Sequence, residues 1–321
     1  FSMKFFELSM LYVIMASVGF AGSLVFYNAY LPEIAEEKDQ DRVSAKGFAL
    51  GYIGSSILLM LCLVILMQYQ LFGFEEKETA TRFSFFLTGV WWIGFSQVSF
   101  AALPVNVFEK SPEGNKFLKG FRELKMVWLQ MIKTVRLKRY LFAFFIYNMG
   151  VQTVMLMAVS FGKKEVPALN NTGMIISVLI IQFIAILGAN LFSNLSSRIG
   201  NLKSLMTIIL IWCGICIWAL WVDLPYEFYI TAALVGLVMG GVQSLSRSTY
   251  SKFLPKTKDH ASFFSFFDVT EKVGIMIGMF IFGSLEGLTG SMRASVFALI
   301  AFFIVGLVLL IMVPENEKND V

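Results

Sequence analysis

Four charged residues in the last third of the chain stand in or beside long apolar stretches: Arg247, Asp268, Glu271 and Lys272. Ionisable groups in hydrocarbon are costly, so such side chains face a bundle interior or a partner. Asp268 and Lys272 are four residues apart and share one face of a helix. We expect a charge cluster at a cytoplasmic gate, in which Arg247 pairs with Asp268 or Glu271 when the gate is closed and separates from them when it opens.

Two other interpretations of these charges stay open. The side chains could simply extend to the membrane surface and hold a loop in place. Alternatively, Asp268 or Glu271 could titrate and couple the protein to protons. The gate interpretation predicts that Arg247→Ala alters function. An Arg247→Ala variant with unchanged function would contradict this interpretation.

A second set of residues combines polarity with a position in the middle of an apolar stretch. Uncharged hydrogen-bonding groups suit a neutral or zwitterionic solute, and we expect them to line a solute cavity. The alternative is a purely structural role, since side-chain hydrogen bonds between membrane helices contribute only about 0.6 kcal/mol each. The candidate residues are Tyr27, Asn28, Tyr30, Tyr147, Asn148, Gln152, Gln182, Gln243 and Ser246.

The elements that position these residues are nine apolar runs. About twenty residues of helix span the roughly 30 Å hydrocarbon core, and only a helix satisfies its own backbone groups there. The sequence therefore predicts an all-α, multi-pass membrane protein, in keeping with 57% hydrophobic and 15% charged residues. The predicted spans are about 8–30, 48–68, 83–105, 140–161, 174–195, 204–222, 228–250, 263–285 and 294–313.

The distribution of Lys and Arg predicts the orientation. One set of alternate connections and chain ends holds nineteen of these residues and the other set holds six, with Lys272 inside a span. Cytoplasmic loops carry the excess of positive charge. We therefore expect a protein of the cell (inner) membrane with a cytoplasmic carboxyl terminus and, because the number of spans is odd, a first residue outside.

The long basic connection at 106–139 divides the chain into residues 1–105 with three spans and residues 140–321 with six. Transporters built from two six-helix halves have their longest cytoplasmic loop between the halves. We therefore expect a fragment of a twelve-helix protein that lacks the first three helices. Apolar residues at three- and four-residue steps from Lys116 to Arg139 predict a basic amphipathic helix lying on the cytoplasmic leaflet.

Small residues recur at helical spacing in three spans and predict close approach of helix backbones. They are Gly47, Gly51 and Gly54, then Gly236 and Gly240, then Gly274 and Gly278. We expect Gly51→Leu to fold poorly.

Several segments carry a family resemblance, among them "VFYNAYLPEIA" at 25–35, "YNMGVQTV" at 147–154 and "GGVQSLSRSTYSKFLP" at 240–255. With these segments the chain resembles the vacuole effluxer family of the major facilitator superfamily, and its bacterial members more than the fungal vacuolar amino-acid exporter. The resemblance implies a secondary active transporter with two pseudo-symmetric bundles around a central cavity that work by alternating access, but it does not imply the solute. The uncharged polar residues named above favour a small, neutral or zwitterionic, amino-acid-like solute. It also adds Arg198 to the gate, although Ser197 replaces the acidic residue common in that superfamily loop.

Other functions find little support. No nucleophile with a base, phosphate-binding loop or metal-ligand cluster is recognisable, so we expect no enzyme, cofactor or metal site. Cys213 and Cys216 lie in an apolar helix, and His260 is the single histidine. We expect a monomer whose partners are a small solute and the lipid bilayer, with protons as a candidate coupling ion and no nucleic acid. The alternatives are a proton-driven exporter of drugs or sugars and a non-transporting receptor or scaffold.

Overall fold

The computed structural model describes residues 6–103, 116–257 and 259–315, and this part of the chain contains helices and no strand. Nine of its helices are long and apolar enough to cross a membrane, which confirms the predicted number of spans. The three-helix group consists of α1 (Phe6–Ala29), α3 (Gln40–Met67) and α4 (Lys77–Ala102), with the short α2 (Leu31–Ile34) and η2 (Glu37–Asp39) between the first two. The six-helix group consists of α6 (Val135–Glu165), α7 (Asn171–Ile199), α8 (Asn201–Ala219), α9 (Pro225–Phe253), α10 (His260–Thr289) and α11 (Met292–Ile311).

Several helices extend beyond the apolar runs that predicted them. The helix predicted from residue 48 begins at Gln40, and the helix predicted from residue 140 begins at Val135. The added turns are polar but partly buried: Asp41 is 7% exposed and Ser44 is fully buried. Hydropathy underestimates such turns because they pack against protein and not against lipid.

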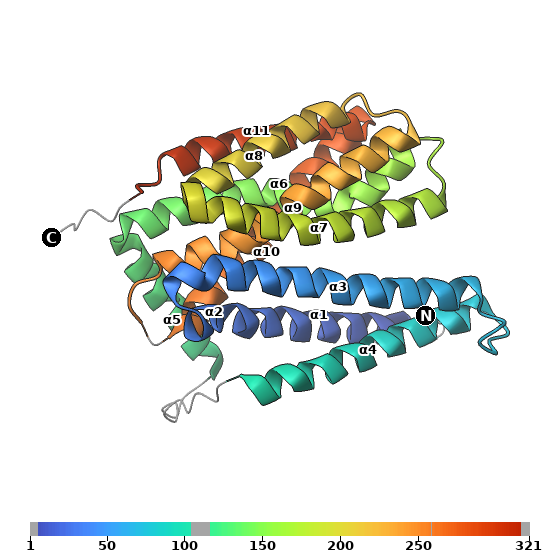
Figure 1. Ribbon diagram of the computed structural model, residues 1–321, viewed down its shortest axis with the longest axis horizontal. Coiled ribbons are helices and arrows are strands. Elements are labelled where there is room, and N and C mark those ends of the chain that lie inside the picture. Colours follow the sequence, from blue (N-terminus) through green and yellow to red (C-terminus); the bar gives the residue numbers. More distant parts are fainter. Residues whose placement is uncertain (1–5, 104–115, 258, 316–321) are drawn as a thin grey trace.

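The two groups lie side by side, with α3 packed along α7 and α9 and α1 packed against α10 (Figure 1). Helix α4 packs on α3 at the outer edge. Most of the apolar core lies inside the six-helix group, where Trp212, Tyr140 and Phe303 are fully buried. The rings of Trp212 and Phe303 stack with centroids 5.4 Å apart and so join α8 to α11.

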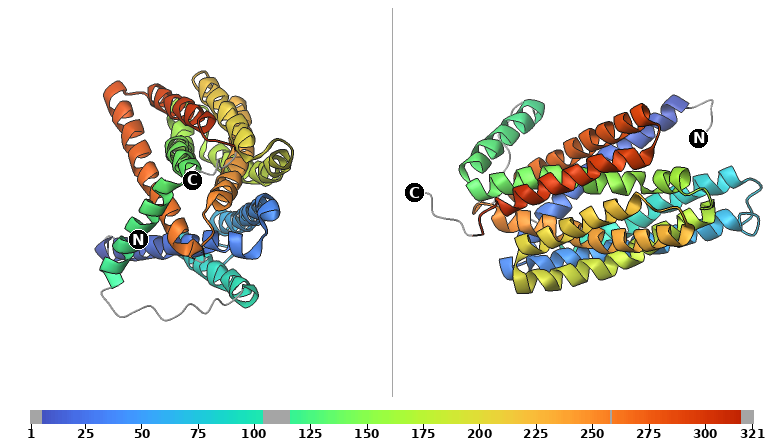
Figure 2. Two further views of the ribbon diagram at one scale, coloured as in Figure 1. Left: turned by 90° about the vertical axis from the view of Figure 1, so that its left-hand side faces the viewer. Right: turned by 90° about the horizontal axis from the view of Figure 1, so that it is seen from above.

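One end of the molecule collects the positive charge and is called here the basic end. There α3, α6 and α10 begin and α7, α9 and α11 end. The helix α5 (Lys116–Lys133) also lies at this end (Figure 2) and is separated from α6 by Thr134, whose ψ of 99° interrupts the helix. Part of its apolar face is buried, because Val127 and Met131 are covered and Trp128 stacks on Phe266 of α10. Its position on a lipid leaflet stays a prediction.

At the opposite end, Arg293 ties three connections of the six-helix group together. Its guanidinium donates to the carbonyl oxygens of Glu165, Leu220 and Val222 at 3.1, 3.1 and 2.8 Å. It also forms ion pairs with Glu165 (3.2 Å) and Asp223 (2.5 Å). One side chain thus holds the end of α6, the α8–α9 connection and the start of α11 in place.

Glycines bring α7 and α9 into backbone contact. A methyl group added at Gly240 would overlap the carbonyl of Ala185, and one added at Gly188 would overlap the carbonyl of Leu237. The close packing predicted at Gly240 is therefore confirmed. The close packing predicted at Gly51 is wrong. Gly51 faces open space with no described atom within 4 Å of an added methyl group. The spacing of the glycines along the sequence predicts that they share one face of a helix. It does not predict which neighbouring helix that face contacts.

We expect Gly240→Ala to lower stability by about 1–3 kcal/mol, the usual cost of overpacking. Gly51→Ala is the matched control, since it changes the same residue type in a helix interior and alanine favours the helix by about 1 kcal/mol. Thermal unfolding of the purified variants measures the difference. A Gly240→Ala variant as stable as Gly51→Ala would contradict the described α7–α9 contact.

Candidate functional site at the interface of the two helix groups

The first polar contacts between the two groups lie at the basic end, around Asp41 in the first turn of α3. Its carboxylate accepts from Lys252 Nζ of α9 at 2.8 Å and from Asn201 Nδ2 of α8 at 2.7 Å. Ser196 of α7 donates to the same carboxylate at 2.8 Å. We call these four residues the Asp41 cluster. The side chains of Lys252 and Asp41 are only 15% and 9% exposed, so solvent screens their attraction weakly.

Arg247, one turn and a half before the end of α9, forms the next contact. It is 4% exposed, and its Nε donates to Ser44 Oγ of α3 at 3.0 Å. Its terminal nitrogens donate to the Ser44 carbonyl (3.1 Å) and to Asn28 Oδ1 of α1 (3.4 Å). The guanidinium also lies over the rings of Tyr27 and Phe48, 4.6 and 4.7 Å from their centroids, in cation–π contact. Every one of these partners belongs to the three-helix group.

Gly47 makes room for this arrangement. A methyl group at this position would overlap the Tyr27 hydroxyl and would stand 3.3 Å from an Arg247 nitrogen. The glycine therefore lets Tyr27 and the guanidinium reach the same face of α3. This is a local packing reason for glycine at this position, and it involves α1 and α9 together.

Uncharged contacts continue along α3 toward the middle of the molecule. Tyr52 donates to the side-chain oxygen of Gln243 on α9. Ser55 and Ser56 both donate to Gln182 Oε1 on α7, at 2.6 and 3.1 Å. In the described residues, no hydrogen bond or ion pair joins the groups beyond Ser56 on α3. The polar interface therefore occupies the basic end and the middle of α3.

The predicted pairing of Arg247 with Asp268 or Glu271 is wrong in this structure. Asp268 and Glu271 instead lie 3.8 and 3.4 Å from Lys272 on their own helix. Gln152 of α6 donates to Glu271 Oε1 at 3.2 Å. Arg247 faces α1 and α3, whereas the three charged residues of α10 contact each other and α6. The pair was predicted because these charges stand at the ends of successive spans on the same side of the membrane, but the directions of the helix faces do not bring them together.

The remaining predicted residues fall in different surroundings. Tyr147 is fully buried and shares a 2.8 Å hydrogen bond with Ser246, so these two join α6 to α9 inside the six-helix group. Asn148 is 6% exposed, and its side-chain nitrogen has no partner in the described residues. Tyr30 precedes α2 and is half-buried. Arg198 is exposed in the last turn of α7 and lies outside the Asp41 cluster.

The residues that complete the interface were not predicted from the sequence. They are Asp41, Ser44, Tyr52, Ser55, Ser56, Ser196, Asn201 and Lys252. One signal was present: Asp41 and Lys252 have opposite charges and flank spans whose ends were predicted on the same side. That signal alone does not select this pair from the many charges at the basic end.

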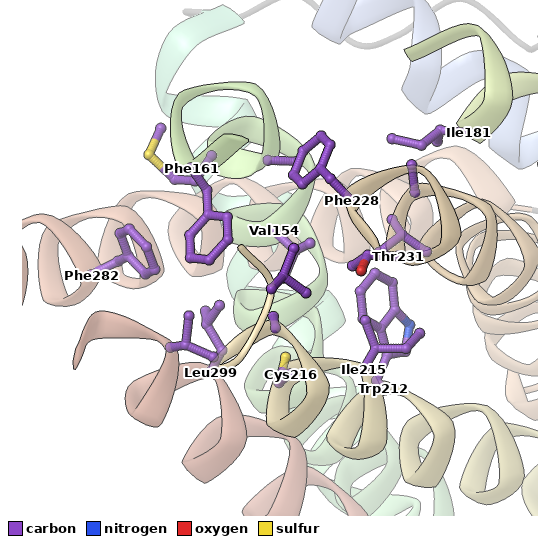
Figure 3. Close-up of a pocket in the computed structure, with 17 residues that line it drawn as sticks. Val154, Phe161, Ile181, Trp212, Ile215, Cys216, Phe228, Thr231, Phe282 and Leu299 are labelled. Atoms are coloured by element: carbon purple, nitrogen blue, oxygen red, sulfur yellow. The ribbon is translucent and has the colours of Figure 1, made fainter. Parts of the chain in front are cut away.

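The six-helix group also contains a partly open apolar cavity of about 70 Å³, shown in Figure 3. Side chains from α6, α8, α9 and α11 form most of its wall, among them Phe161, Trp212, Phe228 and Leu299. None of the predicted solute-contacting residues lines it. Because the wall offers almost only carbon atoms, a zwitterionic solute would lose its hydrogen bonds with water there without replacement.

Comparison with known proteins identifies the family. The chain matches the family described as "Vacuole effluxer Atg22 like" over residues 1–320. It is 31% identical over 316 residues to the uncharacterized MFS-type transporter YxiO of Bacillus subtilis, which covers 98% of this chain and 73% of that protein. It is 24% identical over 282 residues to Autophagy-related protein 22 of Eremothecium gossypii, covering 82% of this chain and 54% of that protein. The chain thus spans about half the length of this fungal relative.

Solved structures show the same fold at low sequence identity. The E. coli fucose:proton symporter FucP, as a variant, superposes with a TM-score of 0.66 at 13% identity, over 91% of this chain and 73% of that one. A bacterial homologue of the iron transporter ferroportin, in its outward-facing state, superposes with a TM-score of 0.62 at 13% identity, over 97% and 74%. The chain belongs to the vacuole effluxer Atg22-like family, and its helices have the arrangement of major facilitator superfamily transporters.

Proposed function

We propose that the protein is a secondary active transporter that moves a small neutral or zwitterionic, amino-acid-like solute by alternating access. The observation that carries this proposal is the one-sided interface between the two helix groups. In the described residues, the polar contacts that α3 makes with the six-helix group run from Asp41 to Ser56 and leave the last turns of that helix without one. Alternating access requires an interface that closes at one end while the other end is free to open.

We propose that the basic end is cytoplasmic and that the structure corresponds to an outward-facing state. The excess of Lys and Arg supports the first statement, and the likeness to an outward-facing transporter supports the second. Within this proposal α1, α3 and α4 are the last three helices of the first half, α5 belongs to the linker, and α6–α11 form the second half. The Asp41 cluster and Arg247 then form the cytoplasmic gate.

Uncharged polar side chains support the proposed class of solute. Asn28, Gln182 and Gln243 stand at the interface of the two groups, and Gln152 lies nearby on α6 beside Glu271. When the gate contacts separate, the amides of these residues become available as donors and acceptors. Such groups bind amino and carboxyl groups without requiring a net charge on the solute.

Solute counterflow into proteoliposomes tests the proposal directly. With a panel of labelled amino acids and sugars, we expect exchange of amino acids by the wild-type protein and a loss of at least tenfold in Arg247→Ala. Arg198→Ala is the matched control, since it removes the same side chain from an exposed position, and we expect its rate to be unchanged. Arg247→Lys separates charge from geometry, because lysine keeps the positive charge but lacks the planar guanidinium that contacts Ser44, Asn28 and the two rings.

The outcomes of this assay have separate meanings. Exchange of no solute in the panel by folded wild-type protein would favour a receptor or scaffold with the same fold. Exchange by Arg247→Ala at the wild-type rate would leave transport standing and remove Arg247 from the gate.

A labelling experiment tests whether the Asp41 cluster keeps the basic end closed. Ser251 on α9 is 6% exposed and its hydroxyl has no partner in the described residues, so a cysteine there breaks no hydrogen bond. After replacement of Cys62, Cys213 and Cys216, we expect Asp41→Asn to raise the labelling rate of S251C by a polar maleimide roughly tenfold. This is the effect of losing one hydrogen bond to a charged group, about 1.5 kcal/mol.

Arg42→Gln is the control for this experiment. Arg42 is next in sequence to Asp41, but its side chain is 79% exposed, so its loss costs little. Equal labelling rates for Asp41→Asn and Arg42→Gln would show that the Asp41 cluster does not hold the gate.

Proton-coupled export of a drug or sugar is the second candidate, and the environment of Glu271 favours it. This carboxylate is 23% exposed, accepts from Gln152, and lies in a membrane-spanning helix. Protonation would remove a charge that is costly there. We expect Glu271→Gln to abolish uptake driven by a pH gradient while retaining solute counterflow, because the glutamine cannot release a proton. A variant that retains gradient-driven uptake would exclude Glu271 as the coupling residue.

A further inference from the structure

A second, open cleft of about 160 Å³ lies between α6 and the end of α11, at the basic end. Its wall consists of Lys138, Arg139 and Phe142 from α6 and of Leu309 and Met312 from the end of α11 and the residue after it. Helix α11 packs on α6, α8 and α10 and lies on the side of the six-helix group away from α3 (Figure 2). The cleft is therefore separate from the proposed gate and from the apolar cavity of the six-helix group.

The charge in this cleft is positive and is not neutralised by its own wall. No carboxylate lines it, and Lys138 forms no ion pair or side-chain hydrogen bond in the described residues. Arg139 Nη1 donates a hydrogen bond to the Met312 carbonyl oxygen at 2.9 Å, which fixes the guanidinium and leaves its other N–H groups available. Both cations stand in the first two turns of α6, where the helix dipole adds a partial positive charge.

The rest of the wall is apolar and faces outward. Phe142 is 53% exposed and lies in α6, which is a membrane-spanning helix. Met312 is 54% exposed and directly follows the membrane-spanning helix α11. Such exposed apolar side chains on a bundle of this kind contact lipid chains. The cleft thus presents two cations at the basic end and a hydrocarbon surface directly beside them.

We infer that this cleft binds an anionic phospholipid from the leaflet at the basic end. The phosphate of the headgroup is held by Lys138 and Arg139, and an acyl chain lies against Phe142, Leu309 and Met312. Basic pockets between membrane helices on the cytoplasmic side bind anionic headgroups in this way. The bound lipid bridges the start of α6 and the end of α11 and so stabilises their contact.

Binding of defined lipids to the purified full chain tests the inference. Native mass spectrometry of the detergent-solubilised protein is titrated with phosphatidylglycerol or with phosphatidylcholine. We expect phosphatidylglycerol to bind with at least tenfold higher affinity than phosphatidylcholine, and the preference to be lost in the Lys138→Gln/Arg139→Gln variant. The wild-type protein should also gain thermal stability with phosphatidylglycerol, and the double variant should not.

Two controls separate this site from general charge effects. Lys163→Gln removes an exposed lysine at the other end of α6, and Lys203→Gln removes a basic-end lysine that pairs with Glu315 outside the cleft. Both should keep the wild-type preference. The single variant Lys138→Gln breaks no described bond, so it replaces the double variant in the test if the double variant does not fold. It should weaken the binding of phosphatidylglycerol but not that of phosphatidylcholine.

Three results would overturn the inference. They are equal binding of the two lipids to the wild-type protein, an unchanged preference in the variants of Lys138 and Arg139, and full displacement of phosphatidylglycerol by inorganic phosphate. The last result would show that the cleft recognises a free anion and not a lipid.

Discussion

The described structure depends on buried charged groups whose partners belong to the other helix group. All described hydrogen bonds of the Arg247 side chain go to residues of α1 and α3, and all described partners of the Asp41 carboxylate belong to the six-helix group. A buried charge that loses its partners costs several kcal/mol unless water reaches it. In the proposed transport cycle, the groups are therefore either closed with these contacts made or open with the charges hydrated, and intermediate separations are unfavourable. This gives the proposed cycle a physical basis for two discrete states in a molecule whose remaining contacts are mostly apolar.

The number and type of the helices could be predicted from the sequence, because the length and hydrophobicity of each apolar run are sufficient to predict a membrane-spanning helix. The predicted division into three and six spans has the same origin, since the connection between them is long and basic. Contacts between spans are different in kind. Whether Arg247 meets Asp268 or Ser44 depends on the rotation of α9 and α10 about their axes, and hydropathy does not determine that rotation.

The candidate site was accordingly predicted in part. Arg247, Asn28, Gln182 and Gln243 were chosen for their polarity within apolar runs, and the structure places all four at the interface of the two groups. Asp41 and Ser44 were missed because they precede the apolar run and look like loop residues. Tyr147 and Ser246 form a hydrogen bond with each other inside the six-helix group. A polar pair between two membrane-spanning helices can therefore have a structural role.

The Arg293 contacts bear on how such a molecule can move. Three connections share one guanidinium, and α7 and α9 touch through their backbones at Gly188 and Gly240. These contacts resist sliding of α7 against α9 and of the start of α11 against the ends of α6 and α8. In the proposed transport cycle, the six-helix group therefore turns as one solid unit, and the free energy for that rotation comes from its interface with the other group and not from deformation within the bundle.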